Sequence, residues 1–394
     1  MGFPLTDTIT WIGKVDWERH RFRGEEYMVR RGSSHNAYLI RDEKTVLIDT
    51  VRAPFDREFV TKLKQEIDLQ HIDYIIASQG DYEQSGALPA LMQEIPHAPI
   101  YCTANAAKSL RGQYHQDWNF HIVKDGGKLS LGSKEITFID MTMLPWPDSI
   151  ACHLSVDDIL FSSNFFSQHL ASDRLFNDYT DGAELLQEAL RYYALVFTPS
   201  NRLVDYKLKE LRNLKLPIRM ICPSHGVIWR DNPQQIVDAY AKWASAYHEN
   251  QVSILYDTMG NSTSRMAEAI ARGIRSADHQ VVIKFFHTAK TDKADLITEI
   301  FKSKAILVGS PTVNRGIMSS VAALLECING MTFKGKRAAA FGTYGWSGES
   351  ARIINRRLQE GGFTVIDFKR EVWNPDDSVV ASCVQFGREF AVKI

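Results

Sequence analysis

The chain has 394 residues, which at about 150 residues per domain predicts two or three domains. Its 46 basic and 47 acidic side chains give a net charge of -1, so no overall basic field would attract nucleic acid or an anionic membrane surface. Hydrophobic residues make up 44% and charged residues 24%, which is ordinary for a packed globular protein and excludes general disorder.

Membrane and disulfide-dependent classes are also disfavoured by the sequence. No apolar run approaches the roughly 18 to 20 residues of a membrane span, and residues 1–26 contain no apolar signal-peptide core. The five cysteines are scattered and form no CxxC pair, which argues against a disulfide framework, a zinc ribbon and a rubredoxin-type site: Cys102, Cys152, Cys222, Cys327 and Cys383. We therefore expect a soluble cytoplasmic protein that binds neither nucleic acid nor membrane.

The first part of the chain alternates short strands with helices. Strand-like runs are predicted at 36–41, 45–51, 72–78, 98–102, 135–141 and 158–163. Helical spacing is found at 59–67, 86–95, 182–197 and 233–250. Many strands with interspersed helices predict two packed sheets flanked by helices rather than one parallel sheet.

The pattern changes near residue 250. An apolar strand, a loop of small residues and a helix follow one another three times, over residues 251–277, 304–330 and 336–362. This repetition predicts a doubly wound parallel α/β domain. We place the boundary near Glu249, which gives domains 1–249 and 250–394 without a long linker between them.

The loop after the first of these strands is rich in hydroxyl groups and leads into a helix. Backbone N–H groups and the positive end of the helix dipole at that point suit a terminal phosphate. The loop is neither GxxxxGK[ST] nor GxGxxG, which disfavours a nucleoside triphosphate or a dinucleotide. An ordinary hydroxyl-rich helix cap remains the alternative. The candidate residues are Thr258, Met259, Gly260, Asn261, Ser262 and Thr263.

The loops after the other two strands strengthen the prediction of a binding site. In an open α/β sheet, these loops converge at the carboxyl edge of the strands, where ligands bind. Aromatic side chains beside flexible glycines offer flat surfaces for an isoalloxazine ring, so we predict FMN. The second loop contributes Ser310, Pro311, Thr312, Asn314 and Gly316, and the third contributes Thr343, Tyr344, Gly345, Trp346 and Gly348.

These segments resemble a known family. YDTMGNSTSRMAEAI, GSPTVNRG and FGTYGWSGES are similar to the FMN loops of flavodoxins, in the form carried by flavodiiron proteins, although Asn261 stands where flavodoxins usually have a small residue. RGSSHNAYLIRDEKTVLIDT, LPWPDS, SNFFSQH and PSHGVIWRDNP resemble the N-terminal domain of the same family. The resemblance implies a metallo-β-lactamase-like αββα sandwich followed by a flavodoxin-like domain. It also implies two non-haem irons held by four histidines and three carboxylates.

The family's metal-ligand positions carry different residues in this chain. Its H-x-E-x-D-H block reads Gln79, Asp81, Glu83 and Gln84, so both histidines are glutamines and the carboxylates have exchanged lengths. A further histidine is Pro145, the bridging aspartate is Asn164, and His225 alone is unchanged. Proline offers no side-chain ligand and amide oxygens are weak, neutral ligands for iron. We expect a degenerate site without iron.

The pocket has two alternatives to a diiron centre. A single hard cation could be held by Asp81, Glu83, the Asn164 carbonyl and His225. The favoured prediction is a metal-free pocket in which Asp81 and Glu83 are neutralised by hydrogen bonds or by a nearby base. His153 and His169, close to the pocket in sequence, are expected to be surface or core imidazoles.

The sequence leads to one main functional hypothesis and two alternatives. The first is an FMN electron-transfer flavoprotein without nitric oxide or oxygen reductase chemistry, in which no catalytic residue is assigned beyond the flavin. The alternatives are a nitric oxide or oxygen reductase with an altered metal site, and a non-enzymatic FMN-binding assembly or regulatory subunit. The resemblance further implies a separate electron donor, either rubredoxin-like or a flavin reductase. It also implies a head-to-tail homodimer or a dimer of dimers.

Overall fold

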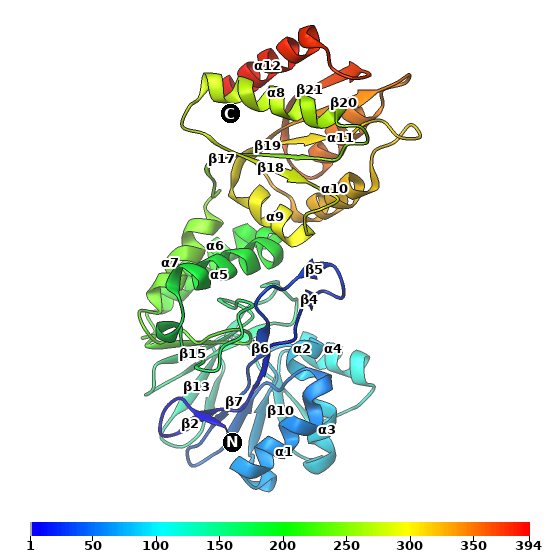
Figure 1. Ribbon diagram of the computed structural model, residues 1–394. Helices are drawn as coiled ribbons and strands as arrows, with labels where there is room; N and C mark the ends of the chain where they lie inside the picture. The colour runs from blue at the N-terminus through cyan, green and yellow to red at the C-terminus, as the bar shows by residue number, and fades with distance from the viewer. Residues whose placement is uncertain (1) are drawn as a thin grey trace. The chain divides into compact units, whose positions relative to one another are not determined.

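The computed structural model describes residues 2–394, which form two compact units (Figure 1). The first unit comprises the residues through Phe22, Val29–Tyr193 and Ser200–Ala244. The second comprises Arg23–Met28, Ala194–Pro199 and Ser245–Ile394. Within residues 2–394, no helix is both long and apolar enough to cross a bilayer.

Two sheets face each other in the first unit. The first sheet has the order β1-β2-β7-β8-β9-β10-β11, and its strands are parallel from β8 onward: β1 (Phe3–Pro4), β2 (Ile9–Trp11), β7 (Tyr38–Ile40), β8 (Val46–Ile48), β9 (Tyr74–Ile76), β10 (Ile100–Cys102) and β11 (Phe120–Ile122). The second sheet contains β12 (Lys128–Ser130), β13 (Glu135–Asp140), β14 (Ile150–Leu154), β15 (Ile159–Ser163) and β16 (Met220–Pro223), in that order. Apolar side chains from both sheets, such as Ile48 and Phe161, fill the space between them.

Helices cover the outer faces of this sandwich. Leu63, Leu91 and Leu110 pack their helices onto the first sheet: α1 (Asp56–Glu66), α3 (Leu88–Glu94) and α4 (Ala104–Tyr114). The later helices of this unit are α5 (Gly182–Val196), α6 (Asn201–Leu214) and α7 (Gln234–Ala244). Short pieces complete the unit: α2 (Tyr82–Ser85), η1 (Ala53–Phe55), η2 (Leu69–His71) and η3 (Asn177–Tyr179). The end of α5 and most of η4 (Thr198–Ser200) fall in the segment Ala194–Pro199, which belongs to the second unit. The predicted αββα architecture is confirmed.

Two short ribbons lie outside the main sheets. Strand β3 (Lys14–Asp16) pairs antiparallel with β6 (Ser33–His35), so that Asp16 lies opposite Ser33 and Lys14 opposite His35. Strand β4 (Arg21–Phe22) pairs with β5 (Tyr27–Met28). The β3–β6 ribbon brings residues from the beginning of the chain to the pocket described below.

The second unit is a doubly wound parallel sheet, as predicted. Its strand order is β18-β17-β19-β20-β21, with bounds Val282–His287, Glu249–Tyr256, Ser303–Gly309, Arg337–Tyr344 and Thr364–Val372. Helices α8 (Ser262–Ala277) and α12 (Asp377–Val392) lie side by side on one face (Figure 1). The other helices are α9 (Lys293–Lys302), α10 (Ser319–Met331) and α11 (Ser350–Glu360). The order reverses between β17 and β19, which is where such sheets bind ligands.

Two local predictions need correction. The helix predicted over 233–250 ends at Ala244, because Ala246 adopts a left-handed conformation with φ of 52° and Glu249 already begins β17. The strand-loop-helix pattern also does not identify β18 and β21. These are edge strands, and β21 carries four charged side chains, Asp367, Lys369, Arg370 and Glu371, which weaken the apolar signal.

Candidate functional site

Four of the predicted ligand positions of the first unit meet in one buried network of hydrogen bonds. Gln79 Nε2 donates to Gln84 Oε1 at 2.6 Å, and Gln84 Nε2 donates to Asn164 Oδ1 at 3.1 Å and to His225 Nε2 at 2.7 Å. Ser149 Oγ donates to Gln79 Oε1 at 3.1 Å. Both hydrogens of the Gln84 amide and its oxygen are therefore used within this network.

The imidazole of His225 is fixed in its neutral form. Its Nδ1 lies 2.8 Å from the carbonyl oxygen of Ser34, which can only accept, so Nδ1 carries the proton and Nε2 presents a lone pair to Gln84. Burial, with a contribution from the nearby His35, lowers the pKa of His225 to about 3. Gly226 follows with φ of 79°, and a Cβ there would lie 1.2 Å from Gln168 Oε1, so only glycine fits.

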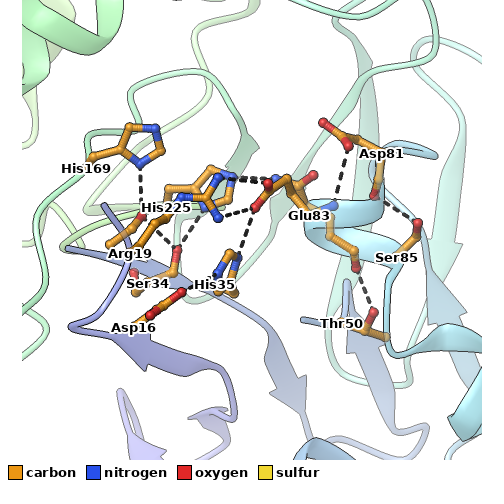
Figure 2. Close-up of polar contacts among 12 residues, drawn as sticks. Asp16, Arg19, Ser34, His35, Thr50, Asp81, Glu83, Ser85, His169 and His225 are labelled. Atoms are coloured by element: carbon orange, nitrogen blue, oxygen red, sulfur yellow. Dashed lines mark hydrogen bonds and ion pairs between the residues drawn. The ribbon is translucent and has the colours of Figure 1, made fainter. Parts of the chain in front are cut away.

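Glu83 is paired with a buried arginine. Arg19 Nη1 donates to Glu83 Oε2 at 2.7 Å and Nη2 donates to Oε1 at 2.8 Å, with side chains only 3% and 4% exposed (Figure 2). Burial alone would raise the pKa of Glu83, but the hydrogen bonds and the charge of Arg19 hold this pKa at about 2. Both carboxylate oxygens of Glu83 are thus occupied by a fixed cation.

The β3–β6 ribbon positions this cation and its neighbours. Arg19 follows β3, and His35 ends β6. His35 Nδ1 lies 3.5 Å from Glu83 Oε2, and its Nε2 lies 3.7 Å from Asp16 Oδ2 (Figure 2). Although burial would raise the pKa of Asp16, the neighbouring His35 and Arg19 hold that pKa below its usual range. The pocket therefore places two carboxylates, Asp16 and Glu83, beside the guanidinium of Arg19 and the imidazole of His35.

Sequence reasoning missed both Arg19 and His35. Arg19 stands in the polar run WERHRFRG, which has no helical or strand periodicity, and it is 64 residues away from Glu83 in the chain. His35 lies in RGSSHNAYLIR, a segment used only for its resemblance to the family. The one available signal was the general expectation that a base would neutralise the acidic pair.

Two of the predicted ligand positions do not join this cluster through their side chains. Asp81 caps α2, with its Oδ1 accepting from the backbone N–H of Glu83 at 3.4 Å. Burial, followed by the negative charge of Glu83, raises the pKa of Asp81 to about 6. Pro145 is half-buried in the loop between β13 and β14 and has no polar side-chain atom.

The remaining histidines near the pocket are buried in the fold. His153 Nε2 donates to the carbonyl of Pro217 at 2.7 Å, as expected for a core imidazole. His169 Nδ1 bonds to Ser33 Oγ at 2.9 Å, its ring centre is 5.7 Å from that of His225, and burial lowers its pKa well below the usual value. Within residues 2–394, no three histidine, cysteine, aspartate or glutamate side chains are arranged to hold a metal ion.

In the second unit, the loop before α8 leaves donors available. Asn261 adopts a left-handed conformation with φ of 66° at the start of α8, and its side chain does not cap the helix. Thr258 Oγ1 is buried without a hydrogen-bond partner among the described residues. Met259 and Gly260 are exposed, whereas Thr263 is fully buried. Uncapped N–H groups and a free hydroxyl at a helix N-terminus form a suitable cradle for an anion.

The three predicted loops are tied together through Thr343. Its Oγ1 lies 3.2 Å from Thr263 Oγ1 in the first loop, and its carbonyl accepts from the N–H of Thr312 in the second loop at 2.9 Å. Ser310 is buried, and its hydroxyl accepts from the N–H of Met318 at 2.9 Å. These bonds hold the three loops at the carboxyl ends of β17, β19 and β20.

The rims of the loops are exposed and partly aromatic. The second loop turns through Asn314 and Arg315, both with positive φ, and Gly316 N–H donates to the carbonyl of Val313 at 2.7 Å. Trp346 is 84% exposed, and Met259 is 70% exposed. Of the remaining predicted residues, Ser262 begins α8, Tyr344 ends β20, and Pro311, Gly345 and Gly348 lie in the same loops.

Comparisons with known proteins agree with both units. The family described as ODP family beta lactamase matches residues 33–226, and the flavodoxin family matches residues 254–383. A β-lactamase-like unit followed by a flavodoxin unit defines the flavodiiron architecture, and this chain belongs to the flavodiiron protein family.

Particular relatives make this assignment specific. Anaerobic nitric oxide reductase flavorubredoxins of Klebsiella pneumoniae and Escherichia coli are each 47% identical over 393 residues, covering 99% of this chain and 82% of theirs. Rubredoxin oxygen:oxidoreductase from Desulfovibrio gigas superposes with a TM-score of 0.96 at 31% identity, covering 100% of this chain and 98% of its own. The flavodiiron protein of Giardia intestinalis gives 0.93 at 27%, covering 100% and 96%.

We predict that Asp81→Asn stabilises the protein in a pH-dependent way. The pKa of Asp81 is raised from 3.8 to about 6, so its proton is held more tightly in the folded state. Stability is then lost as pH rises from about 4 to about 6, which asparagine, being neutral, avoids. The gain of the variant over the native chain should be on the order of 2 kcal/mol larger at pH 7 than at pH 4 in urea unfolding. An equal difference at both pH values would contradict the assignment.

Proposed function

We propose that this chain binds FMN at the three loops of its second unit and transfers electrons as a flavoprotein of the flavodiiron family. We further propose that the pocket of its first unit holds no diiron centre. This second part rests on the contacts that the side chains at the ligand positions make. The side chains at Gln79, Gln84, Asn164 and His225 bond to one another, and Glu83 is held by Arg19.

The second unit offers the groups that an FMN molecule needs. The uncapped start of α8 and the free hydroxyl of Thr258 suit the phosphate, and Ser262 adds a further hydroxyl there. The loops joined by Thr343 place Tyr344 and Trp346 beside them, where their rings can cover a flavin. Bound FMN would supply the redox chemistry, and the residues of the chain would orient it and limit its contact with water.

The first unit does not fit two irons. Iron requires anionic or imidazole ligands with free lone pairs. Here the lone pair of His225 accepts from Gln84, both oxygens of Glu83 accept from Arg19, and the Asn164 oxygen also accepts from Gln84. The same engagement disfavours a single hard cation, because Asp81 caps α2 instead of facing these groups.

The proposed electron transfer needs partners. We propose that the electron donor is a separate protein, rubredoxin-like or a flavin reductase, as membership of the flavodiiron family implies. We also propose the head-to-tail homodimer, or dimer of dimers, implied by the family. The second unit has three exposed apolar side chains, Met259, Trp346 and Trp373. They support this proposal, because large apolar side chains are costly to leave in water and a second copy of the chain would cover them.

Two competing functions remain testable. A nitric oxide or oxygen reductase is favoured by the 47% identity with anaerobic nitric oxide reductase flavorubredoxins over almost the whole chain. That identity preserves the fold, but the ligand types at Gln79, Gln84, Pro145 and Asn164 differ from the metal-binding pattern. A non-enzymatic assembly subunit would keep FMN for stability alone, because a bound ligand stabilises the folded state by mass action.

We predict that FMN affinity depends on the hydroxyls of the first loop. Thr258→Val and Ser262→Ala should each weaken FMN binding by about tenfold, since each removes a hydrogen bond to a charged phosphate worth about 1.5 kcal/mol. Flavin fluorescence titration of the apoprotein gives the dissociation constants. Ser276→Ala, near the other end of α8, is the matched control and should bind as the native chain does. Native protein that takes up no FMN would contradict the proposed site.

We predict that the FMN-loaded protein accepts electrons without reducing nitric oxide catalytically. A flavin reductase with NADH should bleach the flavin absorbance, while anaerobic consumption of nitric oxide stays at the rate of free reduced FMN. The Escherichia coli flavorubredoxin serves as the positive control. Many turnovers of nitric oxide or oxygen per chain would favour the reductase instead. A flavin that no donor reduces would favour the assembly subunit.

A further inference from the structure

The buried guanidinium of Arg19 takes part in the pocket in a way that the lost metal ligands alone do not explain. It lies in the segment that follows β3, outside the segments that carry the ligand positions. Its two terminal nitrogens bond to the two oxygens of Glu83, and its Nε has no hydrogen-bond partner among residues 2–394. The imidazoles of His35 and His225 lie close by, with ring centres 5.5 Å apart.

We propose that Arg19 is a built-in replacement for the positive charge of a metal ion, and that it closes this pocket to divalent cations. The proposal rests on the proposed function, in which the pocket holds no metal, and it gives a physical reason why metal is excluded. The proposal combines two features, ligand positions without iron-binding side chains and an internal cation, and the cation excludes metal independently of the ligand types.

Charge balance supports this role. A buried carboxylate is strongly disfavoured unless a cation and hydrogen bonds compensate it. A divalent ion would supply that compensation in a metal site, whereas here the planar fork of Arg19 supplies it with two short, nearly equal bonds. A further cation at Glu83 would be repelled by the fixed guanidinium, which already donates to both carboxylate oxygens.

The surrounding residues make the replacement self-consistent. Asp16 and Glu83 lie on opposite sides of His35, at 3.7 Å and 3.5 Å from its two ring nitrogens. The neutral His225 turns its lone pair to Gln84, and Gln84 turns its oxygen to Gln79. Glutamine suits these two positions because it can both donate and accept, which a row of unmetallated histidines could do only in selected tautomers.

The first test is a double-mutant cycle on the full-length, FMN-loaded protein. Arg19→Met should lower the melting temperature by about 5 °C or more, because Glu83 is left buried and unpaired. Arg19→Met combined with Glu83→Gln should recover more than half of that loss, because the uncompensated charge is removed. Circular dichroism and FMN content report folding of each variant.

A matched control separates burial from charge. Arg111→Met breaks the exposed ion pair between Arg111 and Asp117 in the same unit and should change the melting temperature by less than about 1 °C. A double variant as unstable as Arg19→Met alone would overturn the charge-compensation role. An Arg19→Met variant with the same melting temperature as Arg111→Met would overturn this role as well.

The second test measures metal exclusion directly. Four substitutions together restore the ligand types of the family: Gln79→His, Gln84→His, Pro145→His and Asn164→Asp. This ligand-restored chain is compared with a second one that also carries Arg19→Met. Titration with Mn²⁺, followed by calorimetry and elemental analysis, should show at least tenfold tighter binding when Arg19 is replaced. Equal affinity in the two backgrounds, or no binding in either, would overturn the proposal.

These outcomes are independent of the proposed function. Iron in the native chain, or turnover of nitric oxide by it, would contradict the metal-free pocket itself. The comparison of the two ligand-restored chains instead isolates the contribution of Arg19, whatever the native chain does with its flavin.

Discussion

The buried ion pair between Arg19 and Glu83 is the interaction on which the state of the first unit depends. A carboxylate that is 4% exposed cannot remain ionised without a compensating cation, and Arg19 supplies one with bonds of 2.7 and 2.8 Å. Once Glu83 is satisfied in this way, the neighbouring groups need only hydrogen bonds. Gln79, Gln84 and Asn164 provide them, so the pocket is closed by contacts within the chain.

The scaffold around this pair is that of the flavodiiron family. The turn through His225 and Gly226 keeps a geometry that only glycine permits at its second residue, and the two sheets superpose closely with rubredoxin oxygen:oxidoreductase. The second unit likewise keeps its loops tied together through Thr343. Fold and site depend on different residues, so the family fold by itself does not fix the chemistry of the pocket.

Much of this organisation was predictable from the sequence. The strand-loop-helix repeats and the apolar periodicity indicate both fold classes, because these patterns are local and recur along the chain. The convergence of the FMN loops follows from the parallel sheet alone. The end of α7 was not predictable, because it depends on the left-handed conformation of Ala246. Arg19 was missed because its role is a tertiary contact that spans 64 residues and leaves no periodic trace.

The two units together describe a flavoprotein of the flavodiiron family in which the side chains of Gln79, Gln84, Asn164 and His225 bond to one another. The most direct test is the iron content of native protein purified from iron-replete cells, measured by elemental mass spectrometry beside the content of released FMN. We predict close to one FMN and less than one iron atom per two chains. Two irons for each FMN would contradict the closed pocket, and with it the role given to Arg19.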